Sequence, residues 1–262
     1  MTDTAFSYGG TTLATYGKVT LINDYLDIPD RRGENQVIPY RHGTVFARKY
    51  YDERKMTFGI AASAATATAL ETLFDTMRAK FSLLTQQTLS MTLTDTTVRE
   101  VQATVDRPIE VERKSPTVAF VVVEFTLTSP FWRSNTAIAD NTTVIDASPH
   151  AMTVTNTGTV EERDPVLLMT GPLKDTVITN STNGCVLTYT GTIASPDTVT
   201  IQTAASGEYT AVHSVSGNVI GNVTHSGASA LMVFNTSANV LAITDVTATT
   251  GTIKFSFYPP FL

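Results

Sequence analysis

The clearest pattern in the chain is an alternation of apolar and polar residues. In the run Lys55–Ala61, the residues Met56, Phe58 and Ile60 alternate with smaller or more polar ones. This period of two is typical of a β-strand with one buried face. A stronger run, Thr117–Leu127, predicts a second strand. Its apolar, β-prone positions are Val118, Phe120, Val122, Phe125 and Leu127.

Between these two strands the apolar period changes to that of a helix, expected over about residues 64–80. The large residues at i, i+3, i+4 and i+7, which share one helical face, are Leu70, Leu73, Phe74 and Met77. Thr68 and Glu71 have the spacing of a capping box, while Ser63 and Thr66 are alternative caps. The pattern therefore leaves the first turn of the helix open.

The rest of the first half reads as further strands and one loop. Lys18–Leu21 and Thr44–Tyr50 have strand composition, and Leu89–Leu93 with Glu100–Val105 predicts a hairpin. Asp24–Gly43 is polar and interrupted by proline and glycine, so it is expected to be a loop.

The second half contains short β-prone runs and no helical period. The expected strands are Ala151–Thr155, Pro165–Thr170, Thr176–Thr179, Cys185–Tyr189, Thr198–Thr203, Tyr209–Val212, Ala230–Phe234, Val240–Ile243 and Thr252–Tyr258. Turn sequences rich in asparagine and glycine separate these runs, and the regular spacing predicts a β-sandwich. The fold class expected for the chain is mainly β, with one amphipathic helix in the first half.

Composition changes at the middle of the chain. Of 262 residues, 42% are hydrophobic and 16% are charged, which is typical of a folded protein. Residues 1–135 hold 15 basic and 15 acidic residues, and residues 136–262 hold 3 basic and 9 acidic residues. The whole net charge of −6 therefore falls in the second half. We therefore expect two domains, 1–135 and 136–262.

The cellular setting is indicated by three features. The single cysteine, Cys185, excludes an internal disulfide framework and is expected to be a small apolar strand residue. The longest apolar run, Val118–Val123, is too short to cross a bilayer. The first residues lack the basic and apolar regions of a secretory signal. Together these features indicate folding in a reducing cytoplasm without membrane insertion.

The order of elements resembles a known family. The Arg- and Tyr-rich segment Gly33–Ile60, followed by a single amphipathic helix between strand runs, resembles the distal tail protein of long-tailed, siphovirus-type bacteriophages. Further runs resemble the galectin-like or carbohydrate-module-like domain of those proteins: Asn156–Gly158, Asp164–Met169 with Gly171, Asp197–Ile201 and Thr252–Tyr258.

The resemblance implies a structural virion protein of the tail-tip baseplate, with no catalytic residue and no cofactor to carry over. Residues 1–135 would form a belt-type domain, and six copies would make a ring that joins the tail tube to the tail-tip hub. The second half would be a galectin-like β-sandwich that projects outward, scaffolds host-attachment proteins and contacts them or a host glycan. The implied partners are other copies of the chain, the tail-tube protein and the hub protein, with DNA only as cargo passing through the lumen. The implied location is the virion tail tip, after synthesis in the cytoplasm of the bacterial host.

Two rival functions remain open. One is a carbohydrate-binding host-attachment module, for which Trp132 is the candidate ligand-stacking residue, with core packing as its alternative. The other is a tail-tube subunit, whose copy number in the virion would differ.

A cluster of cationic and aromatic residues in the first half is the candidate ring interface. Its members are Arg31, Arg32, Tyr40, Arg41, Arg48, Tyr50 and Arg54. Nucleic-acid binding is the alternative, but the acids among these residues leave the half neutral, which weakens it. Arginine and tyrosine mixed with carboxylates favour a protein interface.

No sequence pattern predicts catalysis or metal binding. Asp24, Asp27, Asp30 and Glu34 lie three or four positions apart and do not match the alternating ligands of a calcium loop, so a solvated acidic loop is expected. The histidines share no metal-ligand spacing, and no phosphate-binding glycine loop or nucleophile elbow is present. We therefore expect no metal, no cofactor and no enzymatic activity.

Overall fold

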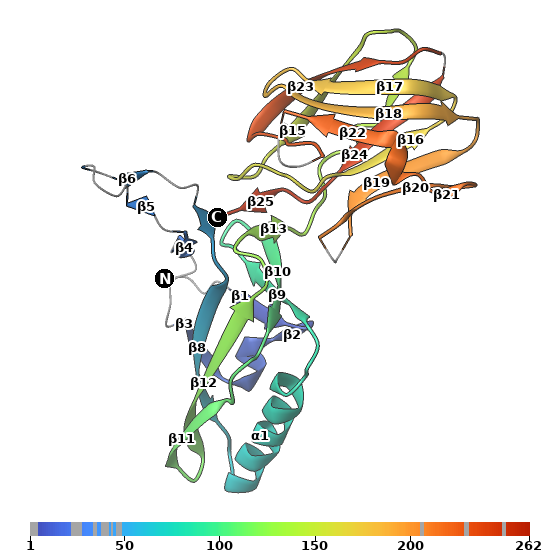
Figure 1. Ribbon diagram of the computed structural model, residues 1–262. Coiled ribbons are helices and arrows are strands. Elements are labelled where there is room, and N and C mark those ends of the chain that lie inside the picture. The colour runs from blue at the N-terminus through green and yellow to red at the C-terminus, as the bar shows by residue number, and fades with distance from the viewer. Residues whose placement is uncertain are drawn as a thin grey trace. The chain divides into compact units, whose positions relative to one another are not determined.

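The computed structural model describes residues 5–21, 28–33, 36–37, 42, 44–45, 49–204, 207–227, 231–247 and 250–262. The chain divides into two compact units, one ending at Asn135 and the other spanning Thr136–Phe261 (Figure 1). Each unit is built from antiparallel sheets, and the described residues contain one α-helix. The mainly β fold with one helix is therefore confirmed.

The first unit is built on one antiparallel sheet with the strand order β2-β1-β9-β10-β12-β8-β3, in which β11 also pairs with β12 and β13 with β10. The strands are β1 Ala5–Tyr8, β2 Thr11–Thr12, β3 Lys18–Leu21, β8 Arg54–Ser63, β9 Gln87–Thr92, β10 Val98–Thr104, β11 Glu110–Ser115, β12 Val118–Leu127 and β13 Trp132–Ser134. The expected hairpin is confirmed as β9 and β10. Strand β11 was missed because it is charged and lies between Pro108 and Pro116.

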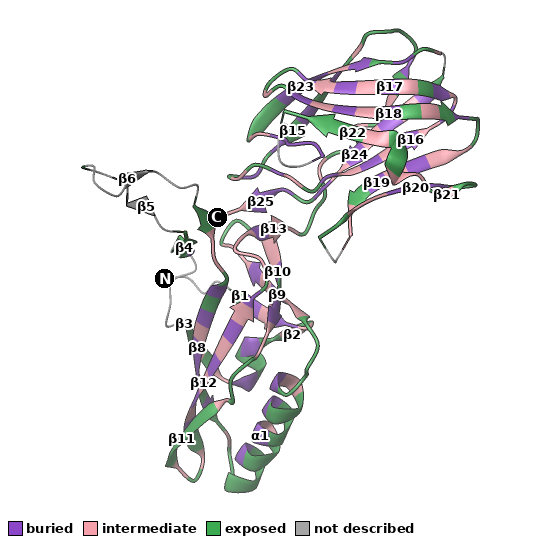
Figure 2. Cartoon of the chain, viewed as in Figure 1, coloured by how far each residue is buried: buried purple, intermediate pink, exposed green. Residues whose placement is uncertain are grey.

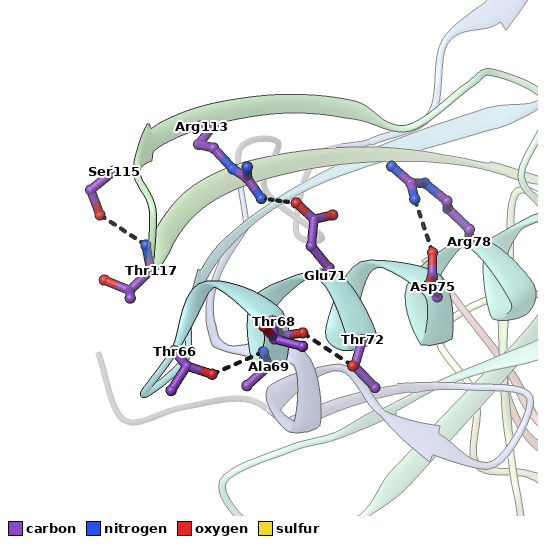
Figure 3. A network of polar contacts seen from close by, with 10 residues as sticks. All are labelled: Thr66, Thr68, Ala69, Glu71, Thr72, Asp75, Arg78, Arg113, Ser115 and Thr117. Carbon is purple, nitrogen blue, oxygen red and sulfur yellow. Dashed lines mark hydrogen bonds and ion pairs between the residues drawn. The ribbon is translucent and has the colours of Figure 1, made fainter.

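Helix α1 spans Ala67–Phe81, and Thr66 is its cap. The Thr66 hydroxyl accepts a hydrogen bond from the backbone N–H of Ala69 at 3.1 Å (Figure 3). The alternative capping box is wrong, because Glu71 forms an ion pair with Arg113 of β11 instead. This ion pair ties the first turns of the helix to the β11–β12 hairpin.

The apolar stripe of α1 packs against one face of the sheet. Its buried members are Leu70, Phe74, Met77 and Phe81, each at most 4% exposed. Figure 2 shows buried residues, in purple, among the exposed residues of α1. Leu73, expected in the stripe, is only half-buried. The Phe81 ring lies 6.0 Å from the ring centroids of both Tyr8 on β1 and Phe125 on β12. One face of the sheet is thus covered by α1.

The second unit is a sandwich of two antiparallel sheets. One has the order β14-β24-β16-β19-β20-β21 and the other β15-β23-β17-β18-β22. The strands are β14 Thr143–Ile145, β15 His150–Asn156, β16 Val166–Thr170, β17 Leu173–Asn180, β18 Cys185–Ile193, β19 Thr198–Thr203, β20 Tyr209–His213, β21 Gly217–Asn218, β22 Val223–Ser226, β23 Ser237–Thr244 and β24 Gly251–Ser256. A further short strand, β25 Pro260–Phe261, belongs to neither of these two sheets. Met169 and Ile253 of the first sheet share one buried cluster with Leu187 and Leu241 of the second. The expected sandwich is therefore confirmed.

One expected strand of the sandwich is wrong. Within Ala230–Phe234, Ala230 lies outside the described residues, and Phe234 makes only an isolated bridge with Glu162. The residues from 231 to 234 are nevertheless buried. A side-chain amide holds this segment in place of a strand ladder, since Asn180 Nδ2 donates to the Val233 carbonyl at 2.8 Å.

We expect residues 136–262 to fold as an isolated polypeptide, because the sandwich has its own buried cluster. The first residues must be retained, since the Ile138 N–H donates to the Phe257 carbonyl and Asn141 Oδ1 accepts from the Phe255 N–H, both at 3.0 Å. Far-ultraviolet circular dichroism should report β structure that melts cooperatively. A random-coil spectrum would rule out an independent domain.

Candidate functional site

Four short strands between Asp30 and Asp52 pair to form a two-stranded extension, here termed the arm (Figure 1). The strands are β4 Arg31–Arg32, β5 Gln36–Val37, β6 Thr44–Val45 and β7 Tyr50–Tyr51. At the base of the arm the Asp52 N–H donates to the Asp30 carbonyl at 2.7 Å. The arm continues directly into β8, so the central sheet positions its base.

The sequence-based reading of the arm was partly wrong. Asp24–Gly43 was expected to be a loop, but β4 and β5 lie within it and pair with β7 and β6. Proline and glycine residues indicate turns locally, but they do not show that a segment pairs with a strand later in the chain. In the expected strand Thr44–Tyr50, residues 46–48 lie outside the described residues.

One face of the arm is anchored to the first unit. The Arg31 guanidinium carbon lies 5.6 Å from the centroid of the Tyr51 ring, the residue directly across the ladder. The Tyr51 ring in turn packs edge-to-face on Phe131 at 5.6 Å. Cation–π and aromatic contacts of this kind stabilise a fixed orientation. Arg31 and Tyr51 therefore position the arm.

On the opposite face, the described side chains at the base of the arm are exposed to solvent. Successive residues on a strand point to opposite faces, so Arg32 and Tyr50, which oppose each other across the ladder, point away from the anchored face. Arg32 and Lys49 are exposed, and Tyr50 is 54% exposed. An exposed aromatic flanked by cations is typical of a protein-binding surface.

The remaining candidate residues fall elsewhere. Tyr40, Arg41 and Arg48 lie outside the described residues. Arg54 begins β8 and is 5% exposed, and its alternation places it on the same face as Met56, so it is a buried residue and not part of the arm surface.

Two further candidates from the sequence differ in burial. Trp132 is 1% exposed, which favours core packing, its alternative, over ligand stacking. Of the acidic loop, Asp30 is exposed, as expected, while Asp24, Asp27 and Glu34 lie outside the described residues.

A second surface, which the sequence analysis missed, lies on β12. Val118, Phe120 and Val122 point away from the face that buries Ala119 and Val121, and Val118 is 40% exposed. These apolar residues occupy positions where a strand with one solvated face normally carries polar side chains. The signal was present in the sequence as valine and phenylalanine on both alternating faces of Thr117–Leu127.

The β11–β12 hairpin that carries this surface is fixed on its other face. Arg113 of β11 pairs with Glu71 of α1 (Figure 3). Its guanidinium carbon lies 5.9 Å from the centroid of the Phe74 ring. The turn of the hairpin is closed by the Thr117 N–H, which donates to Ser115 Oγ at 3.3 Å. The outward surface of β12 is thus presented by a braced element.

Among the residues that the structure describes, no three His, Cys, Asp or Glu side chains are grouped to hold a metal ion. No helix in the described ranges has the length and apolar character needed to span a membrane.

Comparison with solved structures identifies the fold. The chain is similar to the crystal structure of the Dit (gp 19.1) protein of phage SPP1, described as a paradigm of the hub adsorption apparatus in phages that infect Gram-positive hosts. The TM-score is 0.69 at 13% identity, over 99% of this chain and 100% of that chain. The phage P2 baseplate in its activated conformation aligns at TM-scores of 0.47 with Ca and 0.49 with Sr, at 8% and 7% identity, over 97% of this chain and 98% of that chain.

No family model matches the chain, and no curated protein matches it in sequence. At 13% identity the alignment establishes a shared fold. The resemblance expected from the sequence is confirmed at that level.

Proposed function

We propose that the chain is a structural protein of a bacteriophage tail tip. In this proposal it assembles as a closed ring that joins the tail tube to the tail-tip hub and scaffolds the host-attachment proteins. The observation that carries the proposal is the likeness to the SPP1 Dit protein, which extends over 99% of this chain and 100% of that one at a TM-score of 0.69. A match over both units is more informative than one over a single sandwich, which many unrelated proteins share.

Ring formation is supported by two different exposed surfaces on the first unit. A closed ring uses head-to-tail contacts, in which each subunit presents one surface to the neighbour before it and a different surface to the neighbour after it. The Arg32–Tyr50 face of the arm and the outward apolar face of β12 are two such surfaces. We propose six copies per ring, with DNA passing through the lumen as cargo.

In the second unit we propose a role in contacting other tail proteins. A sugar-binding role normally needs aromatic rings that face solvent. Among the described aromatic residues of this unit, Tyr258 is 50% exposed, whereas the rings of Tyr189, Phe234, Phe255 and Phe257 are buried. No catalytic step, metal or cofactor forms part of the proposal, and the finished protein is placed in the virion tail tip.

The mass of the purified chain tests the ring. A hexamer should have six times the 28.2 kDa mass of one chain in native mass spectrometry or light scattering. Negative-stain images of that species should show a central hole. A monomer at every concentration tested would contradict the proposal.

Two further measurements separate the rival functions. A single ring per particle, counted by quantitative mass spectrometry of virions, is expected for a distal tail position, whereas many rings per particle would identify a tail-tube subunit. A glycan array probed with the full chain should remain blank. Specific binding there would favour the carbohydrate-binding module.

A further inference from the structure

The outward apolar surface of β12 is only partly covered within the described part of the subunit, because Val118 is 40% exposed and Phe120 and Val122 are partly buried. Val118, Phe120 and Val122 line the face opposite α1. The Phe120 ring lies over Gly59 of β8. It lies so close that a Cβ atom at position 59 would come within 2.5 Å of Phe120 Cζ. Strands that are apolar on both faces are typical of sheets covered on both sides.

A carboxylate borders this surface. Glu110 of β11 lies opposite Val122, and Glu112 lies opposite Phe120. Glu112 is paired with Lys114, whereas Glu110 is exposed and has no ion pair among the described residues. We term Val118, Phe120, Val122 and Glu110 the β12 patch. Its apolar side chains lie beside the carboxylate of Glu110.

The exposed face of the arm is complementary to the β12 patch. It offers the aromatic ring of Tyr50 beside the cations Arg32 and Lys49. Residues 31–49 hold five basic residues and one acidic residue, a net charge of +4. The rest of residues 1–135 holds ten basic and fourteen acidic residues, a net charge of −4. The arm is therefore attracted to surfaces of the kind that the remainder of this unit presents.

The arm and the patch lie at different places on one subunit. The base of the arm joins β8 at Arg54, while Val122 lies opposite Gly59 and Val118 opposite Ser63. Five residues of strand separate Arg54 from Gly59, which is about 17 Å, and the arm leaves β8 at the end away from the patch (Figure 1). The two surfaces are placed to meet between copies of the chain.

We infer that the Arg32–Tyr50 face of one subunit's arm covers the β12 patch of a second copy, with Tyr50 against Phe120 and Val122 and with Arg32 paired to Glu110. The inference rests on the ring proposed above and specifies its contact. Because the two surfaces differ, the contact is head-to-tail and repeats around a closed ring.

Charge exchange tests the contact. Arg32→Glu and Glu110→Arg should each lower the ring-to-monomer ratio by about tenfold or more, since like charges then face each other at every interface. The double variant Arg32→Glu/Glu110→Arg should restore the ring, because each interface again holds one charge of each sign. Arg78→Glu and Asp75→Arg are matched controls on the exposed surface of α1 and should leave the ratio unchanged.

The outcomes are distinguishable from those of the proposed function. Single variants that form the normal ring, or a double variant that fails to recover it while its circular dichroism is native, would overturn this contact and leave the ring itself standing. A wild-type chain that never forms a ring would overturn both.

Cross-linking provides a second test that does not depend on weakening the ring. The double variant Tyr50→Cys/Val122→Cys, treated with a short bis-maleimide, should give a ladder of covalent oligomers on a denaturing gel. Tyr50→Cys/Asp75→Cys should remain monomeric, and the native Cys185 is buried in both. A monomer band alone from the first variant would overturn the contact.

Discussion

Replacing Asn239 by alanine is expected to destabilise the second unit by about 3–5 kcal/mol. The side chain is completely buried. Its Nδ2 donates to the carbonyls of Asn235 at 2.9 Å and Ser237 at 3.0 Å, and its Oδ1 accepts from the Asn235 N–H at 2.9 Å. Alanine leaves these buried groups without that partner, and each unsatisfied group costs about 1–3 kcal/mol.

Hydrogen exchange measured by mass spectrometry on peptides from β17 and β23 would report the loss as a lower opening free energy. Asn222→Ala, at an exposed position, is the matched control and should change stability by no more than about 0.5 kcal/mol. Equal protection in the Asn239→Ala variant and the wild type would show that the amide network does not hold the sandwich closed.

This network explains why one part of the sandwich was misread from the sequence. Residues 231–234 have strand composition, but Asn180, Asn183 and Asn239 bind the backbone of residues 233–235 in place of a neighbouring strand. In the sequence Asn183 forms part of an Asn-Gly pair and therefore reads as a turn signal. The local pattern indicates burial correctly and leaves the hydrogen-bond partner unspecified.

Features that depend on local periodicity were predicted well. The α1 stripe, the β9–β10 hairpin and strands β8 and β12 follow from spacing alone, since a residue's neighbours on the same face are set by the geometry of its own element. The edge strand β11 and the two halves of the arm depend on pairing with distant residues, and the sequence contains no direct record of that pairing.

The candidate site shows the same division. Composition selected Arg31, Arg32 and Tyr50 together, and only the ladder assigns Arg31 to the anchored face and the other two to the exposed face. The burial of Arg54 follows from alternation with Met56 on β8. Its charge gave no indication of this. For Arg54, spacing within the strand therefore indicates burial better than residue type does.

Replacing Phe74 by alanine is expected to lower the free energy of unfolding of the first unit by about 3–5 kcal/mol, through lost transfer energy and the cavity left behind. Phe74 is 2% exposed in the stripe that packs on the sheet. The guanidinium carbons of Arg78 and Arg113 lie 6.0 and 5.9 Å from its ring centroid. Urea unfolding followed by the fluorescence of Trp132, the only tryptophan, would measure the loss.

Thr72→Ala, at an exposed position of the same helix, should remain within about 0.5 kcal/mol of the wild type. An unchanged unfolding midpoint for Phe74→Ala would show instead that the stripe is not buried within the subunit and serves a contact between subunits. Phe74 also supports Arg113, which braces the hairpin that carries Glu110. Phe74→Ala should therefore weaken folding and ring assembly together, whereas Arg32→Glu should weaken assembly and leave the unfolding free energy unchanged. That contrast separates the residues that build the subunit from those that join it to the next one.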